Sequence, residues 1–485
     1  MSAGRAGHDV VVVGSGVAGL AAAVEAVRTG LRVVVLESEP RLGGASAISG
    51  GRCLIVGSPL QEAAGVDDGV ELAMADWARA GGGLADLDWA RQYVECSRAW
   101  VYDWVEEELG IEWCELRLEE RNSVPRAHLP RGGGEAMVAV LSELAGSLGV
   151  ELRVDTPVER LLAGGAGVLV GGARLDARAT IVCSGGFAGN REMLLEHAPG
   201  LHRIDRLLGG SGPTALGGGH GLLAAVGADF EQLDNVWLYP VGTPNPRDPS
   251  GWRGLVVRGI ENEIWLDREG RRFHDENRRG GASGSPALLR QPGQTSWGIF
   301  DAEEAAKLLL LDDAHFGTPF LTPPERAAEF WRTSAFAWRA ESFEQLAGAA
   351  GLPPQAVIDS VARFNSAVAA GEDDELGRDL TGARPIATPP FHAIRYLPLA
   401  QKNFGGVRTD LSCRVLAAAR RPLPGLYAAG EVAGMAGGRI NGAGALEGTM
   451  YGPCLFSGRL AGRTAAIDLG IRIDAAPQAP GGASS

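Results

Sequence analysis

Residues 8–37 read HDVVVVGSGVAGLAAAVEAVRTGLRVVVLE, and this stretch decides the fold. The run Val10–Val13 is typical of a buried parallel strand, and Leu31–Leu36 is typical of a second one. Between the two runs lie small residues that suit a helix packed closely against both strands. The order strand, helix, strand predicts an α/β fold that begins with a Rossmann-like unit.

Three glycines open the expected helix. Gly14, Gly16 and Gly19 form the pattern G-x-G-x-x-G, in which the first permits the turn, the second lets the backbone approach a pyrophosphate and the third lets the helix pack on the strand. A helix beginning near Val17 would direct free N–H groups at that pyrophosphate. Glu37 ends the second strand, where a carboxylate accepts hydrogen bonds from ribose hydroxyls and repels the extra phosphate of NADP. The stretch therefore predicts a site for FAD or NAD.

Composition excludes several classes of function. The 485 residues carry a net charge of -14 with no basic block, so the sequence does not indicate nucleic-acid binding. The 6 cysteines form no CxxC pair and no CxxCH, and no metal-ligand spacing occurs, so we expect neither a bound metal nor covalent haem. We find no apolar run of membrane-spanning length and no hydrophobic signal core, and we expect a cytoplasmic protein without an integral membrane segment.

A second glycine-rich loop favours FAD over NAD. It reads ESEPRLGGASAISGG over residues 37–51, and NAD binding does not require it. From this loop onward the chain resembles the fumarate reductase/succinate dehydrogenase flavoprotein family, which includes flavocytochrome c fumarate reductases and 3-ketosteroid dehydrogenases. The stretches 128–162, 179–194, 217–230 and 425–465 are similar to that family in the same order. The loop lacks the histidine to which succinate dehydrogenases attach FAD, so the resemblance implies a non-covalent flavin.

The resemblance also implies a set of cofactor contacts and a domain plan. Residues 1–238 and 395–472 would form one FAD-binding domain of the glutathione-reductase type, and residues 239–394 an inserted α+β capping domain that closes over the substrate. Apolar spacing predicts helices over 301–316 and 323–351, and composition predicts a disordered tail over 473–485. The residues expected to bind FAD are Gly14, Gly16, Val17, Ala18, Gly19, Glu37, Ser38, Gly43, Gly44, Ala45, Ser46, Ser49, Gly50, Gly51, Val158, Ser184, Gly185, Gly430, Glu431, Gly444, Ala445 and Leu446.

Oxidising or reducing a carbon–carbon bond requires a hydride exchanged with the flavin and a proton exchanged at the neighbouring carbon. Arg439, in GGRINGAGA, is similar to the arginine with which fumarate reductases bind a substrate carboxylate. Arg258 resembles an arginine of the family's proton-delivery path, and Arg279 resembles the proton donor, with Arg278 an equal match after a shift of one residue. Lys402 stands where fumarate reductases have a substrate-binding histidine.

Other positions depart from the family patterns. Leu255 replaces the glutamate that begins the cap motif, and Tyr239 replaces the histidine of H-P-T, from where it could hydrogen-bond a substrate oxygen. The steroid dehydrogenases' Y-P-G-A-G-A is INGAGA over 440–445, which loses the ketone-binding tyrosine and keeps the small residues that follow.

These patterns lead to one expected function and several alternatives. We expect an FAD-dependent oxidoreductase that forms or reduces a C=C bond beside a carboxylate or carbonyl of a small molecule, with an external electron donor or acceptor. A 3-ketosteroid or cyclic enone dehydrogenase, a non-catalytic flavin-binding protein, and an amine or L-aspartate oxidase remain open.

Overall fold

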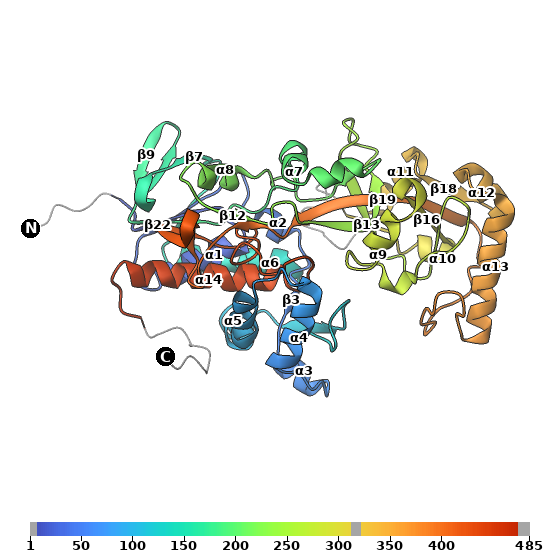
Figure 1. The fold of residues 1–485 in the computed structure, drawn as a ribbon, viewed down its shortest axis with the longest axis horizontal. Coiled ribbons are helices and arrows are strands. Elements are labelled where there is room, and N and C mark those ends of the chain that lie inside the picture. The colour runs from blue at the N-terminus through green and yellow to red at the C-terminus, as the bar shows by residue number, and fades with distance from the viewer. Residues whose placement is uncertain (1–6, 312–321, 474–485) are drawn as a thin grey trace, which may run out of the picture. The chain divides into compact units, whose positions relative to one another are not determined.

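The computed structural model describes residues 7–311 and 322–473 of the chain. It divides into two compact units (Figure 1). Unit 1 comprises the chain up to Ala198, Gly212–Val236 and the part from Lys402 onward, and unit 2 comprises Pro199–Ser211 and Trp237–Gln401. Most of the tail expected at 473–485 lies outside the described residues.

A six-stranded sheet forms the centre of unit 1. Five neighbouring strands of this sheet run parallel to one another, and the strand at one edge is antiparallel to its neighbour. Valines and other apolar residues fill β1 and β2, which are wholly buried because a parallel sheet is covered on both faces. The strand order is β6 (Glu151–Arg153), β2 (Val33–Leu36), β1 (Val10–Val13), β10 (Ala179–Val182), β22 (Arg421–Ala428) and β21 (Arg414–Ala417).

Two long helices from opposite ends of the chain pack together in unit 1. Helix α1 (Val17–Val27) lies against α14 (Tyr451–Asp468), as the left part of Figure 1 shows. The contact is close because α14 presents glycines: a Cβ on Gly458 would lie 2.2 Å from the carbonyl oxygen of Ala18. This packing joins the last helix of the chain to the helix that follows the first glycine turn.

Smaller elements complete unit 1. Three minor sheets are formed by β3 (Cys53–Leu54), β5 (Ala127–Pro130) and β4 (Trp113–Arg117); by β7 (Val158–Leu161), β8 (Gly167–Val170) and β9 (Ala173–Asp176); and by β12 (Phe230–Glu231) with β20 (Gly406–Val407). The remaining helices are α2 (Gly44–Ala47), α3 (Pro59–Ala63), α4 (Val70–Gly81), α5 (Leu87–Ser97), a π-helix (Arg98–Glu108), α6 (Gly133–Ser147), α7 (Arg191–His197) and α8 (Gly218–Ala224).

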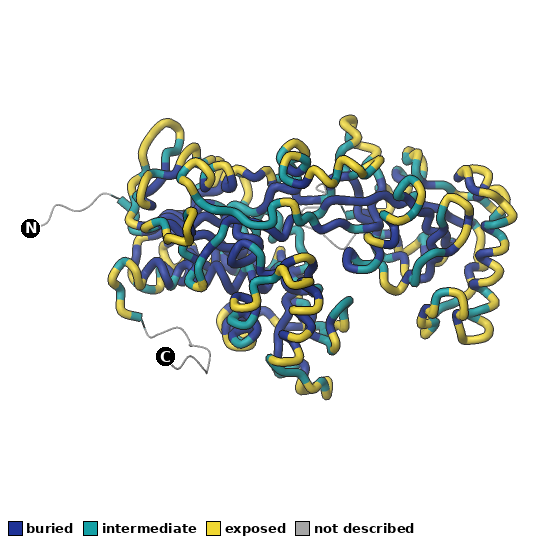
Figure 2. The backbone as a smooth tube through the Cα atoms, viewed as in Figure 1, coloured by how far each residue is buried: buried dark blue, intermediate teal, exposed yellow. Residues whose placement is uncertain are grey.

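A second sheet organises unit 2 around the long strand β19 (Phe391–Asn403). Most residues of this strand are buried and appear dark blue in Figure 2, whereas helix α13 (Pro354–Ala370) carries many exposed residues. The sheet order is β15 (Ile264–Leu266), β16 (Ser296–Phe300), β19, β13 (Val236–Pro244), β14 (Gly254–Arg258) and β17 (Leu309–Leu311), with β11 (Leu208–Gly209) and β18 (Ala337–Ala340) also paired to β19. The α-helices in the described part of unit 2 are α9 (Gly284–Leu289), α10 (Ala302–Ala305), α11 (Pro324–Thr333), α12 (Phe343–Ala350) and α13 (Pro354–Ala370).

Two helix predictions in unit 2 are wrong in part. Within the described part of the stretch, 301–311, only Ala302–Ala305 is an α-helix, and Leu309–Leu311 is a strand because it pairs with β14 and buries Leu310. The positions beyond 311 in that stretch lie outside the described residues. Within 323–351, strand β18 separates α11 from α12, since Ala337–Ala340 pairs with β19.

Candidate FAD and substrate site

The first glycine turn of unit 1 has no room for side chains. Gly14 has φ +99°, and a Cβ there would lie 2.5 Å from the carbonyl oxygen of Cys183. A Cβ on Gly19 would lie 2.0 Å from the carbonyl oxygen of Gly14. Two of the three glycines are therefore required by close backbone approach, which leaves the start of α1 bare, as a pyrophosphate site needs.

Glu37 is buried at the end of β2, where it organises the turn. Its Oε2 accepts hydrogen bonds from the backbone N–H and the hydroxyl of Ser15, at 3.0 and 2.5 Å. Its Oε1 accepts from the Ser38 hydroxyl at 3.2 Å and from the backbone N–H of Glu39 at 3.1 Å. A carboxylate has about four acceptor sites, so ribose hydroxyls would bind here by displacing the rotatable Ser15 or Ser38 hydroxyl.

The second glycine loop is docked onto the first turn. Ser46 Oγ accepts a hydrogen bond of 3.0 Å from the backbone N–H of Val17, and the N–H of Gly43 donates to Ser15 Oγ at 3.0 Å. Helix α6 supports the loop, because a Cβ on Gly134 would lie 2.1 Å from the carbonyl oxygen of Ser46. Sequence reasoning missed Ser15 and Gly134, although Gly134 lies in the visible glycine run RGGGEAM.

Polar atoms without partners mark the ends of β10 and β22. Within the described residues, neither Ser184 Oγ nor Glu431 Oε1 has a hydrogen-bond partner, although both atoms are buried. Burial raises the pKa of Glu431, while Lys402 and the backbone N–H groups of Asn403 and Gly186 act to lower it. Buried polar atoms are normally satisfied, so these two atoms indicate a polar ligand.

The remaining residues predicted to contact FAD fall into three groups: glycines beside open space, a buried stretch near the carboxyl end, and positions in other elements of unit 1. A Cβ on Gly185 would meet nothing within 4 Å, and one on Gly44 would meet only Thr214 Oγ1 at 3.7 Å, so open space adjoins both. The stretch Gly444–Leu446 is buried and follows Asn441, whose Oδ1 accepts a hydrogen bond of 2.6 Å from the Thr449 hydroxyl. The other positions are Ala18 in α1, Ala45 in α2, Ser49, Gly50 and Gly51 after it, Val158 in β7, and Gly16 and Gly430 in turns.

These features of unit 1 fit an elongated, polyanionic cofactor. Bare glycine turns, a helix N-terminus and orphaned polar atoms lie at the carboxyl ends of β1, β10 and β22, which are neighbours in the sheet. Open parallel sheets bind ligands at this edge. Gly14, Gly19, Ser184 and Glu431 could therefore hold FAD.

Two cations predicted to contact substrate are engaged within unit 1. Arg439 Nε lies 2.8 Å from Glu231 Oε2, and Arg408 shares the same carboxylate group at 3.1 Å from Oε1. Lys402 lies close enough to Glu431 to lower the pKa of that carboxyl. Each cation therefore already balances a carboxylate of the protein.

In unit 2, two of the arginines predicted to handle the proton each contact another side chain of the unit. Arg258 Cζ lies 4.8 Å from the centroid of the Tyr239 ring, which is a cation–π distance. Arg279 forms an ion pair of 2.5 Å with Glu263, and its side chain is 25% exposed. The neighbouring Arg278 is exposed and donates a hydrogen bond of 3.4 Å to Ser283 Oγ.

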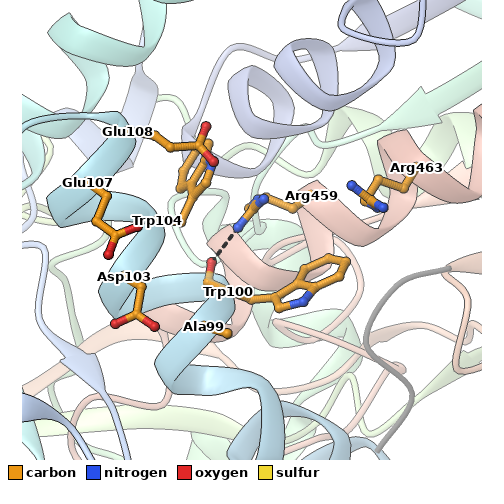
Figure 3. Close-up of a pocket in the computed structure, with 8 residues that line it drawn as sticks. All are labelled: Ala99, Trp100, Asp103, Trp104, Glu107, Glu108, Arg459 and Arg463. Atoms are coloured by element: carbon orange, nitrogen blue, oxygen red, sulfur yellow. Dashed lines mark hydrogen bonds between the residues drawn. The ribbon is translucent and has the colours of Figure 1, made fainter. Parts of the chain in front are cut away.

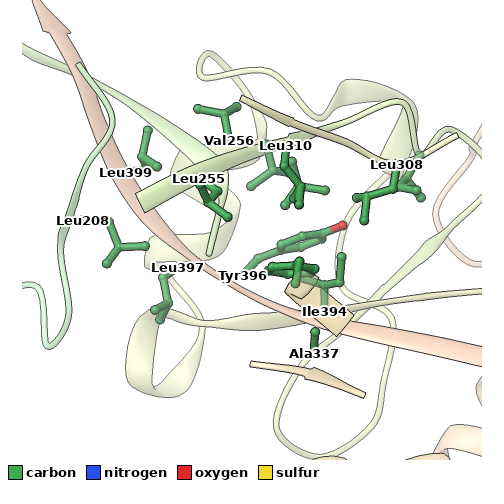
Figure 4. Packing of buried hydrophobic residues seen from close by; sticks show 14 of the residues in the cluster. Leu208, Leu255, Val256, Leu308, Leu310, Ala337, Ile394, Tyr396, Leu397 and Leu399 are labelled. Atoms are coloured by element: carbon green, nitrogen blue, oxygen red, sulfur yellow. The ribbon is translucent and has the colours of Figure 1, made fainter. Parts of the chain in front are cut away.

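Leu255 belongs to the core of unit 2. It is 1% exposed and packs among Leu208, Leu399 and other apolar side chains, as Figure 4 shows. No acid stands at this position; the carboxylate that pairs with Arg279 is that of Glu263. Sequence reasoning missed Glu263, which stands directly before the buried strand β15 and could have been noticed as a charge beside an apolar run.

A pocket on unit 1 is lined by side chains of the π-helix and α14 that hold these helices together (Figure 3). Arg459 crosses it, donating to the carbonyl oxygen of Trp100 at 2.8 Å and to Glu25 Oε1 at 2.6 Å. The guanidinium carbon lies 4.2 Å from the centroid of Trp104. These bonds tie α14 to α1 and to the π-helix.

The described residues contain neither a membrane-spanning helix nor a metal-binding cluster. None of the helices in residues 7–311 and 322–473 combines the length and the apolar character that a membrane crossing requires. In the same ranges, no group of three or more His, Cys, Asp or Glu side chains could hold a metal ion.

Comparison with known proteins decides the family. The family model described as "FAD binding domain" matches residues 9–449. The chain belongs to this family. It is 30% identical to a KsdD-like steroid dehydrogenase of Mycobacterium tuberculosis over 95% of this chain and 96% of that one. It is also 30% identical to a fumarate reductase (cytochrome) of Shewanella frigidimarina, over 94% of this chain and 77% of that one.

A solved structure agrees with these relatives. The open conformation of a flavocytochrome c3 fumarate reductase superposes with a TM-score of 0.74 at 28% identity, covering 96% of this chain and 79% of that one. The predicted family, the α/β fold and FAD as the cofactor are therefore confirmed. The chain is an FAD-dependent oxidoreductase acting on CH–CH groups.

Proposed function

We propose that this enzyme forms or reduces a C=C bond adjacent to a carboxylate or carbonyl group, and that unit 2 handles the proton. The observation that carries the proposal is the pair of Arg279 and Glu263, in which the arginine is one-quarter exposed and the carboxylate is wholly buried. Relatives named for fumarate reduction and steroid dehydrogenation support the reaction class. Unit 1 would be the FAD-binding domain and unit 2 the capping domain.

The proton step follows from the charge on Arg279. When bound, FAD would supply the hydride in the reductive direction, and Arg279 would give a proton to the carbon beside the carbonyl or carboxylate. Burial alone would lower the pKa of Arg279, but Glu263 and Tyr396 raise it above its usual value. The resting guanidinium is thus a cation, which can donate a proton in reduction, whereas proton abstraction in the oxidative direction would require its neutral form.

Whether the site accepts an anionic or a neutral substrate depends on Arg439. A carboxylate substrate would bind Arg439 by competing with Glu231, which now lies 2.8 Å away. Lys402 would add a second cation, and Tyr239, held against Arg258, would hydrogen-bond a substrate oxygen. The second candidate is a ketosteroid or cyclic enone as substrate, because Arg439 and Arg408 are matched by Glu231 and Asp229, which leaves no net charge for an anion. The electron donor or acceptor would be external.

Anaerobic reoxidation of the flavin tests the proposal. The purified enzyme is reduced chemically and mixed with fumarate or crotonate in one series, and with 2-cyclohexenone or 4-androstene-3,17-dione in another, while flavin absorbance is followed. Arg279→Gln should slow reoxidation by about 100-fold or more, as loss of a proton donor does, and Arg278→Gln, its exposed neighbour, should not. Equal rates in both variants would refute the role of Arg279.

Arg439→Ala then separates the two substrate classes. Loss of reoxidation by the acids alone would support the carboxylate clamp. Reoxidation by the enones alone, unaffected by this substitution, would support the second candidate. A flavin that no acceptor in either series reoxidises would favour a non-catalytic flavin-binding protein.

A further inference from the structure

A wholly buried carboxylate stands behind Arg279. The Glu263 side chain is 0% exposed, and it accepts hydrogen bonds from three side chains of unit 2. Its Oε1 accepts from Arg279 Nη2 at 2.5 Å and from Trp265 Nε1 at 2.9 Å. Its Oε2 accepts from the Tyr396 hydroxyl at 2.7 Å. Both carboxylate oxygens are therefore satisfied, which is what a buried charge requires.

The neighbouring strand makes room for this arrangement. Gly298 lies inside β16, opposite Trp265, where a glycine weakens a strand. A Cβ at Gly298 would lie 2.3 Å from Glu263 Oε2 and 2.7 Å from the Tyr396 hydroxyl oxygen. The missing side chain is thus explained by the space that the carboxylate and the phenol occupy.

The geometry leaves one side of Arg279 available. Its Nη2 is held by Glu263 and by the carbonyl oxygen of Ile260. Among the residues that the structure describes, Nε and Nη1 of Arg279 donate no hydrogen bond, and the side chain is 25% exposed. One edge of the guanidinium is anchored in the interior, and the other edge can reach a substrate atom.

We propose that Glu263, assisted by Tyr396, is the positioning residue for Arg279. It fixes the orientation of the guanidinium and holds its positive charge, while Leu255, at the position where the cap motif has its glutamate, only fills the core. This inference rests on the proposed role of Arg279 as proton donor. Glu263 itself touches neither substrate nor flavin.

Glu263→Gln tests the inference because it removes the charge and preserves the shape. An amide oxygen can still accept from Arg279 and Trp265, and the amide N–H₂ can donate to the Tyr396 oxygen. With the best acceptor of the reoxidation series, we expect the maximal rate to fall by about 10-fold or more, as for loss of a precisely held catalytic geometry. The half-saturating acceptor concentration should change by less than about threefold, because uniform binding is retained.

Two further readouts separate positioning from folding. In Glu263→Gln the rate should fall toward alkaline pH, because a guanidinium supported by Glu261 and Tyr396 without Glu263 loses its proton more readily, and the wild-type rate should not. Asp301→Asn is the matched control, since Asp301 is another wholly buried carboxylate of unit 2, paired with Arg384 at 2.6 Å. It should lower the thermal midpoint of unfolding and leave the rate and its pH profile unchanged.

The double variant Arg279→Gln/Glu263→Gln should be no slower than Arg279→Gln alone, because Glu263 acts only through Arg279. If Arg279→Gln is slow and Glu263→Gln has the wild-type rate and pH profile, the inference is overturned and the proposed function stands. If Arg279→Gln has the wild-type rate, the proposed function itself fails. Should Glu263→Gln not fold, Tyr396→Phe, which retains the ion pair, should still slow the rate by about two- to tenfold, and an unchanged rate would overturn the inference.

Discussion

Replacing Gly19 by alanine tests whether the first glycine turn binds FAD. The new Cβ would lie 2.0 Å from the carbonyl oxygen of Gly14 and 3.0 Å from its carbonyl carbon. Contacts this short do not occur, so the start of α1 must move away by about 1 Å or more. One hydrogen bond to a charged group contributes about 1.5–3 kcal/mol. Losing one at the pyrophosphate would therefore weaken FAD binding by about 10- to 150-fold.

Gly146→Ala is the matched control for this substitution. Gly146 is an exposed position of α6, and a Cβ there would meet nothing within 4 Å. Alanine should stabilise that helix by up to about 1 kcal/mol and leave FAD binding unchanged. The assay is titration of the flavin-free proteins with FAD, followed by flavin fluorescence, together with their thermal unfolding. Wild-type FAD affinity in Gly19→Ala would show that the turn is not the pyrophosphate site.

Three other measurements address charge and cofactor attachment. Burial alone would raise the pKa of Asp76, but hydrogen bonds from Ser123 and Arg126 lower it to about 2. The stability from this carboxylate is present above about pH 4 and lost as the pH falls toward 2. The thermal midpoint of unfolding should therefore decrease less in Asp76→Asn than in the wild type when the pH is lowered from 4 to 2. Burial, together with His197, lowers the pKa of His220 to about 4. The free energy of unfolding should therefore decrease as the pH falls from about 6.5 to 4. Urea unfolding at pH 7 and pH 5 should show this decrease in the wild type and not in His220→Phe. Because residues 37–51 contain no histidine, acid precipitation should leave the flavin in the supernatant, and flavin in the pellet would contradict a non-covalent cofactor.

Local patterns in the sequence predicted the nucleotide-binding half of unit 1 well. The strand Val10–Val13 and the helix beginning at Val17 have the predicted bounds, because a buried valine run and a glycine turn are signals that a few neighbouring residues carry alone. The leucines at 308–311 carry no such signal: a short apolar run suits a helix or a strand, and pairing with β14 decides between them.

The ion pairs could not be predicted because they join distant segments. Arg439 was expected to be available to a substrate, yet Glu231, from another part of unit 1, lies beside it. Tyr396 reaches Glu263 across more than a hundred residues of sequence. Such contacts follow from the sheet order of each unit, which no local window of sequence contains.

The packing of α14 on α1 has a consequence for biosynthesis. Strand β10 and helix α1 are made early, whereas their later partners follow much further along the chain: β22 begins roughly 240 residues after β10, and α14 begins roughly 420 residues after α1. At the usual pace of translation these gaps last on the order of 10–50 s for β10 and 20–80 s for α1, during which β10 presents an unpaired edge and α1 an uncovered apolar face. Such surfaces attract other chains, so the nascent protein should depend on chaperones or on rapid folding of unit 2 during this interval, more than a protein of the same size with a continuous nucleotide-binding domain.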